Sequence, residues 1–236
     1  MNRTVPKMPV VTCALIILCT VIFLTGPASG FLPGHGSGTS LHRAQAAYFN
    51  HWGVVPRTLW SGALRPFVTP LTALFLHASW LHLLGNLLFL HVFGGPVEMR
   101  MGRLRFAVFY VSVGYIAMLC YAAAHSQSGE TLVGASGAVS GVLGAFLYLH
   151  PRARVTSLFP FLYFLPLRFP AWVVLVFWLA LQWIAARGDT DGPGVAYLAH
   201  VVGFTLGFLY AWARFRRFRT ATVGTPAPAT QGESTP

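Results

Sequence analysis

Six apolar segments of 15 to 21 residues divide this chain, and they constrain its fold more than any other feature. They are Met8–Thr25, Leu76–Gly95, Leu104–Ala124, Ser136–His150, Pro170–Ala186 and Val195–Ala213. In a bilayer such segments form helices, because a helix satisfies its own backbone hydrogen bonds. Only 9% of the residues are charged and 55% are hydrophobic, which is far from the balance of a soluble domain. The sequence therefore predicts an all-α membrane protein, a bundle of six transmembrane helices.

The basic residues are distributed asymmetrically around these segments. With the N-terminus inside, twelve of the sixteen Arg and Lys residues fall on the cytoplasmic side. This bias predicts that both termini are cytoplasmic, in a multi-pass protein of the cell (plasma or inner) membrane. The expected organisation is an N-terminus over 1–7, a membrane domain over 8–213 with an external loop over 26–75, and a basic, then disordered, tail over 214–236.

Two other interpretations concern the N-terminus and the charge. Arg3 and Lys7 precede the first apolar segment and Ala28-Ser29-Gly30 follows it, so this segment is alternatively a signal peptide. The formal net charge of +11 is compatible with nucleic-acid binding, but the arginines flank apolar runs and form no basic face, which argues against it. The three cysteines lack paired spacing, so neither a disulfide framework nor a zinc site is indicated.

The fourth segment begins with a serine between glycines, in the sequence Gly134-Ala135-Ser136-Gly137. Small neighbours leave room for a substrate backbone beside the hydroxyl, and the unpaired N–H groups of a helix start can bind an anion. Ser136 is therefore a candidate nucleophile. The alternative is an N-cap serine followed by a small-residue motif for helix packing.

Further polar residues lie at matching depth in the second and sixth segments. His82 and Asn86 are four residues apart and share one helix face. At ~1.5 Å per residue, Ser136 lies ~24 Å and His200 ~21 Å above the arginines that end their segments. His82 and Asn86 lie ~24 and ~18 Å above Glu98. All four belong to one layer below the outer boundary, where polar groups are costly unless they face one another or water.

Small residues predict that the fourth and sixth segments touch. Ser136, Ser140 and Gly144 form one stripe, and His200 shares a stripe with Gly203 and Gly207. His200 then becomes the base for Ser136, in a dyad. A full triad is not expected, because the five acidic residues lie at the inner end, in the tail and in the outer loops. His82 and Asn86 would donate to the developing oxyanion.

Two other classes of function remain open at this point. His77-xxxx-His82 matches one histidine box of membrane desaturases, but di-iron sites of that kind need several further boxes, which the remaining histidines do not form. We therefore expect no metal and no other cofactor. The other alternative is a non-enzymatic protein that binds transmembrane clients, which the absence of the serine or the histidine would have favoured.

Taken together, these motifs resemble the rhomboid family of intramembrane serine proteases. The resemblance runs from about Phe75 to Gly207 and rests on four motifs: His77-xxxx-His82-xxx-Asn86, Gly94-Gly95-Pro96-Val97-Glu98-Met99-Arg100, Gly134-Ala135-Ser136-Gly137 and Ala199-His200-xx-Gly203-xxx-Gly207. It implies Ser136 as nucleophile, His200 as base and then acid, and His82 and Asn86 around the oxyanion. Glu98 and Arg100 resemble a structural Glu-x-Arg pair that ties the inner end of the second helix.

The chain departs from some relatives at two places. Ser140 stands where they carry a tyrosine stacked on the catalytic histidine, so other packing must orient His200. Leu64-Arg65 replaces a Trp-Arg pair of the first external loop. The resemblance implies an endopeptidase that cleaves single-span membrane proteins within the lipid bilayer, near its outer face, and no nucleic-acid partner.

Overall fold

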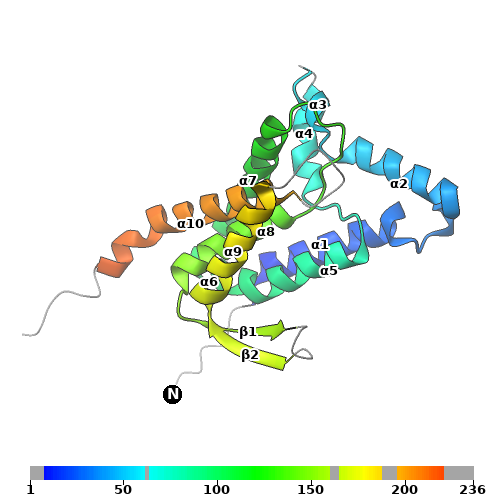
Figure 1. The fold of residues 1–236 in the computed structure, drawn as a ribbon. Helices are drawn as coiled ribbons and strands as arrows, with labels where there is room; N and C mark the ends of the chain where they lie inside the picture. The colour runs from blue at the N-terminus through cyan, green and yellow to red at the C-terminus, as the bar shows by residue number, and fades with distance from the viewer. Residues whose placement is uncertain (1–7, 62–63, 160–164, 188–195, 221–236) are drawn as a thin grey trace, which may run out of the picture.

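The structure is a computed structural model that describes residues 8–61, 64–159, 165–187 and 196–220. Each of the six predicted apolar segments is a helix (Figure 1). They are α1 (Val10–Thr25), α5 (Trp80–Phe89) continued through a π-turn at Leu90–Gly94 into α6 (Gly95–Met101), α7 (Arg103–Ala124), α8 (Ser136–Leu149), α9 (Ala171–Arg187) and α10 (Tyr197–Thr220). The expected all-α fold class is confirmed.

These helices fall into two length classes. Among the described residues, Trp80–Met101, Arg103–Ala124 and Tyr197–Arg216 are long and apolar enough to cross a membrane. α1, α8 and α9 are apolar but shorter, with 16, 14 and 17 residues. Because an α-helix rises ~1.5 Å per residue, α8 is only ~21 Å long, which is less than the ~30 Å hydrocarbon thickness.

α8 lies at the centre of the bundle. Every residue from Gly137 to Phe146 is buried, and α10 is its main neighbour. The two backbones are so close that a Cβ atom on Gly203 would lie 2.1 Å from the Gly137 carbonyl oxygen. A Cβ on Gly207 would lie 1.9 Å from the Gly141 carbonyl oxygen. The predicted contact between the fourth and sixth segments is therefore confirmed, and glycine is what permits it.

The N-terminal end of α1 is held by a carboxylate from α6. Glu98 is 2% exposed, and its oxygens accept hydrogen bonds from the Val11 N–H at 3.0 Å, the Thr12 N–H at 2.8 Å and the Thr12 hydroxyl at 2.8 Å. The first N–H groups of a helix have no partner within it, so an anion there both satisfies donors and interacts well with the helix dipole. Glu98 thus ties α6 to α1. Arg100 lies with its guanidinium carbon 5.8 Å from the centre of the Phe215 ring.

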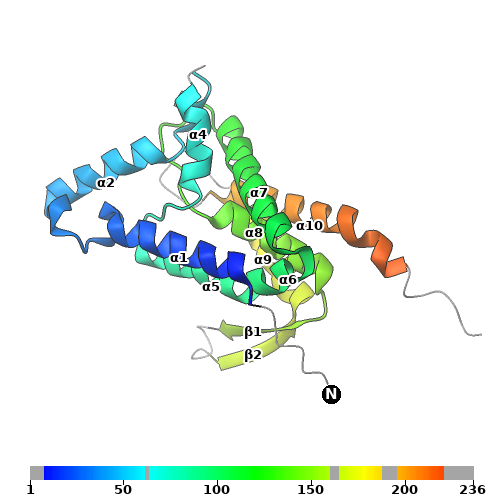
Figure 2. The same ribbon diagram turned by 180° about the vertical axis from the view of Figure 1, so that it is seen from behind.

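The described part of the segment between α1 and α5 carries two short 3-10 helices, Pro27–Ser29 and Pro33–His35, and three α-helices, α2 (Gly38–Trp52), α3 (Pro56–Leu59) and α4 (Leu64–Ala73). α3 and α4 pack against α7, and α2 reaches away from the bundle (Figure 2). This segment also meets the loop before α8. Val54 and Leu132 exchange backbone hydrogen bonds, and the Gly134 N–H donates to the Ala73 carbonyl at 2.9 Å. The external segment therefore packs over the N-terminal end of α8.

The opposite end of α8 leads into a feature that the sequence analysis did not predict. β1 (Arg154–Phe159) and β2 (Leu165–Pro170) pair antiparallel, with Arg154 opposite Pro170. The hairpin lies at the end of the bundle opposite α3 and α4 (Figure 1). At the C-terminus, α10 continues to Thr220, so the basic start of the predicted tail is helical. The rest of that tail, 221–236, and the predicted N-terminal segment 1–7 lie outside the described residues.

Candidate active site

Ser136 and His200 meet where α8 and α10 begin. Ser136 is the first residue of α8, and His200 lies in the first turn of α10. The Ser136 Oγ and His200 Nε2 atoms are 2.8 Å apart, which is a hydrogen bond. The close contact of Gly137 with Gly203 brings the two helix starts together. His200 is 8% exposed, so it is largely buried.

The second ring nitrogen of His200 has a partner that the sequence analysis missed. His200 Nδ1 lies 2.7 Å from the Oε1 atom of Gln182, on α9. The ring of Trp178, also on α9, stacks on the imidazole with centroids 6.1 Å apart and planes 28° apart. Only a carboxylate was expected as a third group, as in a serine protease triad. The available signal was an amide in an otherwise apolar helix, because Gln182 is the single Asn or Gln of α9.

His82 and Asn86 lie on one face of α5, as expected. The Ser79 hydroxyl caps this helix by accepting from the His82 N–H at 3.2 Å. Asn86 is 7% exposed, and its Nδ2 donates to the His82 carbonyl at 2.9 Å. His77 is 2% exposed, and its ring packs edge-on against the ring of His82 with centroids 5.1 Å apart. His77 therefore supports His82 from the side.

Gly134 gives the His82 ring its place beside Ser136. A Cβ atom on Gly134 would lie 2.6 Å from His82 Nε2, which is closer than real Cβ contacts. The residue also has φ = +129°, a conformation that side chains other than glycine rarely adopt. Both the backbone conformation and the position of the His82 ring therefore favour glycine here.

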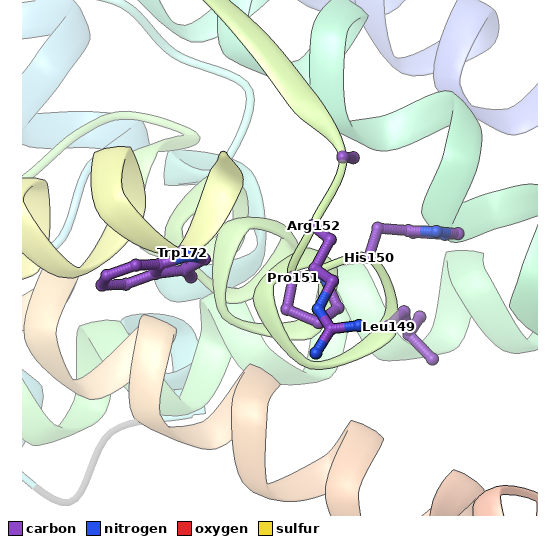
Figure 3. Close-up of a pocket in the computed structure, with 6 residues that line it drawn as sticks. Leu149, His150, Pro151, Arg152 and Trp172 are labelled. Carbon is purple, nitrogen blue, oxygen red and sulfur yellow. The ribbon is translucent and has the colours of Figure 1, made fainter. Parts of the chain in front are cut away.

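These residues share one cavity of about 590 Å³. Its lining includes Ser136, His200, His82, Asn86, Gln182 and Trp178. A second cavity, of about 630 Å³, lies at the other end of α8 around Arg152 and Trp172. In Figure 3 the ring of His150 points away from Trp172 there. The length of α8, ~21 Å, separates this second cavity from Ser136, so it is not part of the candidate site.

The cavity around Ser136 contains the parts needed for acyl transfer. It has a hydroxyl hydrogen-bonded to an imidazole, a helix start that presents backbone N–H groups, and a nearby imidazole and amide. Within the described ranges, no group of three or more His, Cys, Asp or Glu side chains is placed to hold a metal ion. The His77–His82 pair of the desaturase-like alternative is accordingly a ring–ring contact without further ligands in that part of the chain.

Comparisons with known proteins concern the family of the whole matched region. The family model of the rhomboid domain matches residues 65–217. Rhomboid protein 1, mitochondrial, of Saccharomyces cerevisiae is 34% identical over 143 residues, which cover 58% of this chain and 39% of that protein. Rhomboid protease GlpG of Serratia proteamaculans is 33% identical over 138 residues, which cover 58% of this chain and 45% of that protein. The matches thus span less than half the length of these relatives.

Proposed function

Because this chain belongs to the rhomboid family, we propose that it is an intramembrane serine endopeptidase that acts through a dyad of Ser136 and His200. The observation that carries this proposal is the 2.8 Å hydrogen bond between Ser136 Oγ and His200 Nε2 at the wall of a cavity. A hydroxyl is a weak nucleophile until a base takes its proton, and a buried imidazole at this distance is suited to that task.

The reaction follows from this geometry in two steps. His200 Nε2 accepts the Ser136 proton while Oγ attacks the substrate carbonyl, and the protonated imidazole then gives that proton to the departing amine. The products of this step are an acyl-enzyme and a new N-terminus. In the second step His200 takes a proton from water, the hydroxide attacks the ester, and the proton returns to Ser136.

The oxyanion of each tetrahedral intermediate needs donors on the opposite side of the carbonyl. Because Ser136 is the first residue of α8, its backbone N–H has no partner within that helix, and His82 and Asn86 line the same cavity. Asn86 uses one N–H to bond the His82 carbonyl, and its amide carries a second. We therefore assign His82 and Asn86 to charge stabilisation, with His77 and Gly134 fixing the position of the His82 ring.

Replacing Asn86 by alanine is expected to lower kcat by about 10²–10³-fold and to leave measurable turnover, the usual effect of losing one oxyanion donor. The rate is measured on a single-span model substrate in detergent. Leu84→Ala is the matched control, because Leu84 is on the same helix and is 56% exposed. Full turnover by Asn86→Ala, or an equal loss in Leu84→Ala, would contradict the oxyanion role.

Membrane location and substrate class follow from the same site. We place the protein in the cell (plasma or inner) membrane with both termini in the cytoplasm, because most basic residues then lie inside. Ser136 then lies at the outer end of a helix too short to span the bilayer, so water can reach the acyl-enzyme from outside. The substrates are single-span membrane proteins whose outer end unwinds, because peptide carbonyls within an intact helix are already hydrogen-bonded.

Cleavage is expected near the outer interface, after a small residue that fits against Gly134 and Gly137. The cut site in a model single-span substrate is mapped by mass spectrometry, with Ser136→Ala as the inactive control. Replacing Gly, Ala or Ser of that region by Leu in a strong helix context should reduce cleavage. A cut in the cytoplasmic third of the span, or cleavage unaffected by these replacements, would rule out an outward-facing site that selects unwound segments.

A further inference from the structure

Helix α9 holds the His200 imidazole in two ways. Gln182 Oε1 lies 2.7 Å from Nδ1, and the Trp178 ring stacks on the imidazole face. The two residues are four apart on α9, so they project from one helix face. Both line the cavity that contains Ser136. Helix α9 thus sets the plane of the His200 ring by stacking and supplies the hydrogen-bond partner of its Nδ1 atom.

The Gln182 contact also selects the tautomer of His200. An amide oxygen can only accept a hydrogen bond, so Nδ1 must carry the proton and donate it. In a neutral imidazole Nε2 then has the free lone pair, and it can accept the Ser136 hydroxyl at 2.8 Å. The opposite tautomer would make Nε2 a donor to the Ser136 oxygen, with no lone pair free to take the hydroxyl proton, and would leave the serine without a base.

Other groups around the ring do not perform this function. Ser140 lies one turn after Ser136 on α8, but its hydroxyl donates to the Ser136 carbonyl at 2.7 Å. Tyr197, on α10, meets the imidazole edge-on with centroids 6.3 Å apart. His82, on α5, lies on the Ser136 side of the cavity. Among the described residues, the side chain that accepts a hydrogen bond from Nδ1 is Gln182.

We propose that Gln182 is a positioning residue that holds His200 in the base-competent tautomer and so completes a hydrogen-bonded chain of Ser136, His200 and Gln182. This inference rests on the proposed function of the same site. During attack the proton passes from Ser136 Oγ to Nε2, and the Nδ1–H bond to Gln182 Oε1 stays in place. It then becomes charge-assisted, which stabilises the imidazolium without moving a second proton. A neutral amide gives less stabilisation than a carboxylate, but it adds no buried charge.

Two substitutions of similar shape separate hydrogen bonding from packing. Gln182→Leu removes the acceptor, and it should lower kcat by about 10- to 100-fold with KM changed by less than about 2-fold. Gln182→Glu keeps an acceptor, and it should retain at least wild-type kcat near neutral pH. Leu181→Ala is the control on the same helix, because Leu181 is 47% exposed. The rate of Ser136 labelling by a fluorophosphonate probe should follow the same order, which removes any effect of substrate entry.

A direct measurement decides the tautomer independently of activity. The ¹⁵N chemical shifts of His200 in labelled protein should report a protonated Nδ1 in wild type and in Gln182→Glu, and a loss of that preference in Gln182→Leu. A protonated Nε2 in wild type, wild-type rates in Gln182→Leu, or equal losses in the Leu and Glu variants would each overturn the inference. Absence of labelling in wild type would instead refute the proposed protease activity, while the ¹⁵N shifts would still test the role of Gln182.

Discussion

Replacing either Ser136 or His200 by alanine is expected to abolish nearly all proteolysis, by about 10⁴-fold or more, and the double variant should be little worse than either single one. The two side chains form one hydrogen-bonded unit, so removing one leaves the other without its function. Effects within such a unit are strongly non-additive. Initial rates on a single-span substrate, measured for all four proteins in the same detergent, give the comparison.

The control for this comparison of the single and double variants is Ser140→Ala. Ser140 lies one turn further along α8, and its hydroxyl donates its hydrogen bond to the Ser136 carbonyl and not to the His200 ring, so turnover should persist. All variants should remain folded, because each substitution removes atoms at the cavity wall. A fluorophosphonate probe should label wild type and Ser140→Ala. Labelling that persisted in Ser136→Ala would refute the nucleophile assignment.

Gly207→Ala is expected to destabilise the protein by about 2–3 kcal/mol, although the same change in an exposed helix interior stabilises by about 1 kcal/mol. The added Cβ would lie 1.9 Å from the Gly141 carbonyl oxygen, which is backbone and cannot move aside alone. α8 and α10 must separate instead, and the Ser136–His200 distance grows with them. Activity should therefore fall together with stability.

Denaturation of the purified protein by SDS in mixed micelles measures this effect. Gly85→Ala is the matched control, since Gly85 also lies within a helix but a Cβ there meets no atom within 4 Å. That variant should be as stable as wild type or slightly more so. If the two variants unfolded at the same SDS fraction, the α8–α10 contact would not be the close backbone approach described above.

The sequence predicted the helices well because burial in lipid leaves a simple signature. Long apolar runs marked all six, and the glycine spacing after His200 predicted its contact with α8, which the structure confirms. Matching depths indicated that Ser136, His200, His82 and Asn86 share one layer, and all four line one cavity. Their catalytic roles stay predictions, as do the membrane orientation and the tail.

Other features depend on tertiary contacts that leave little local trace. Gln182 was missed because an amide in an apolar helix is recognisable as a partner only once α9 is placed beside His200. The β-hairpin was missed because its register, from Arg154 opposite Pro170 to Phe159 opposite Leu165, is set by pairing across it. For Glu98, the resemblance indicated a tie at the inner end of the second helix. It did not indicate that the tie is to the first turn of α1.

The contacts of the Glu98 carboxylate show that the folding unit is longer than the region that matches the family. The family match begins at residue 65, yet donors on Val11 and Thr12 hold the buried Glu98 inside the matched region. A truncated chain that starts at residue 65 would keep the anion and lose three of its hydrogen bonds, and an uncompensated buried charge costs several kcal/mol. Removal of α1 as a signal peptide would have the same effect. The minimal folding unit therefore extends at least 54 residues upstream of the homologous block, to Val11.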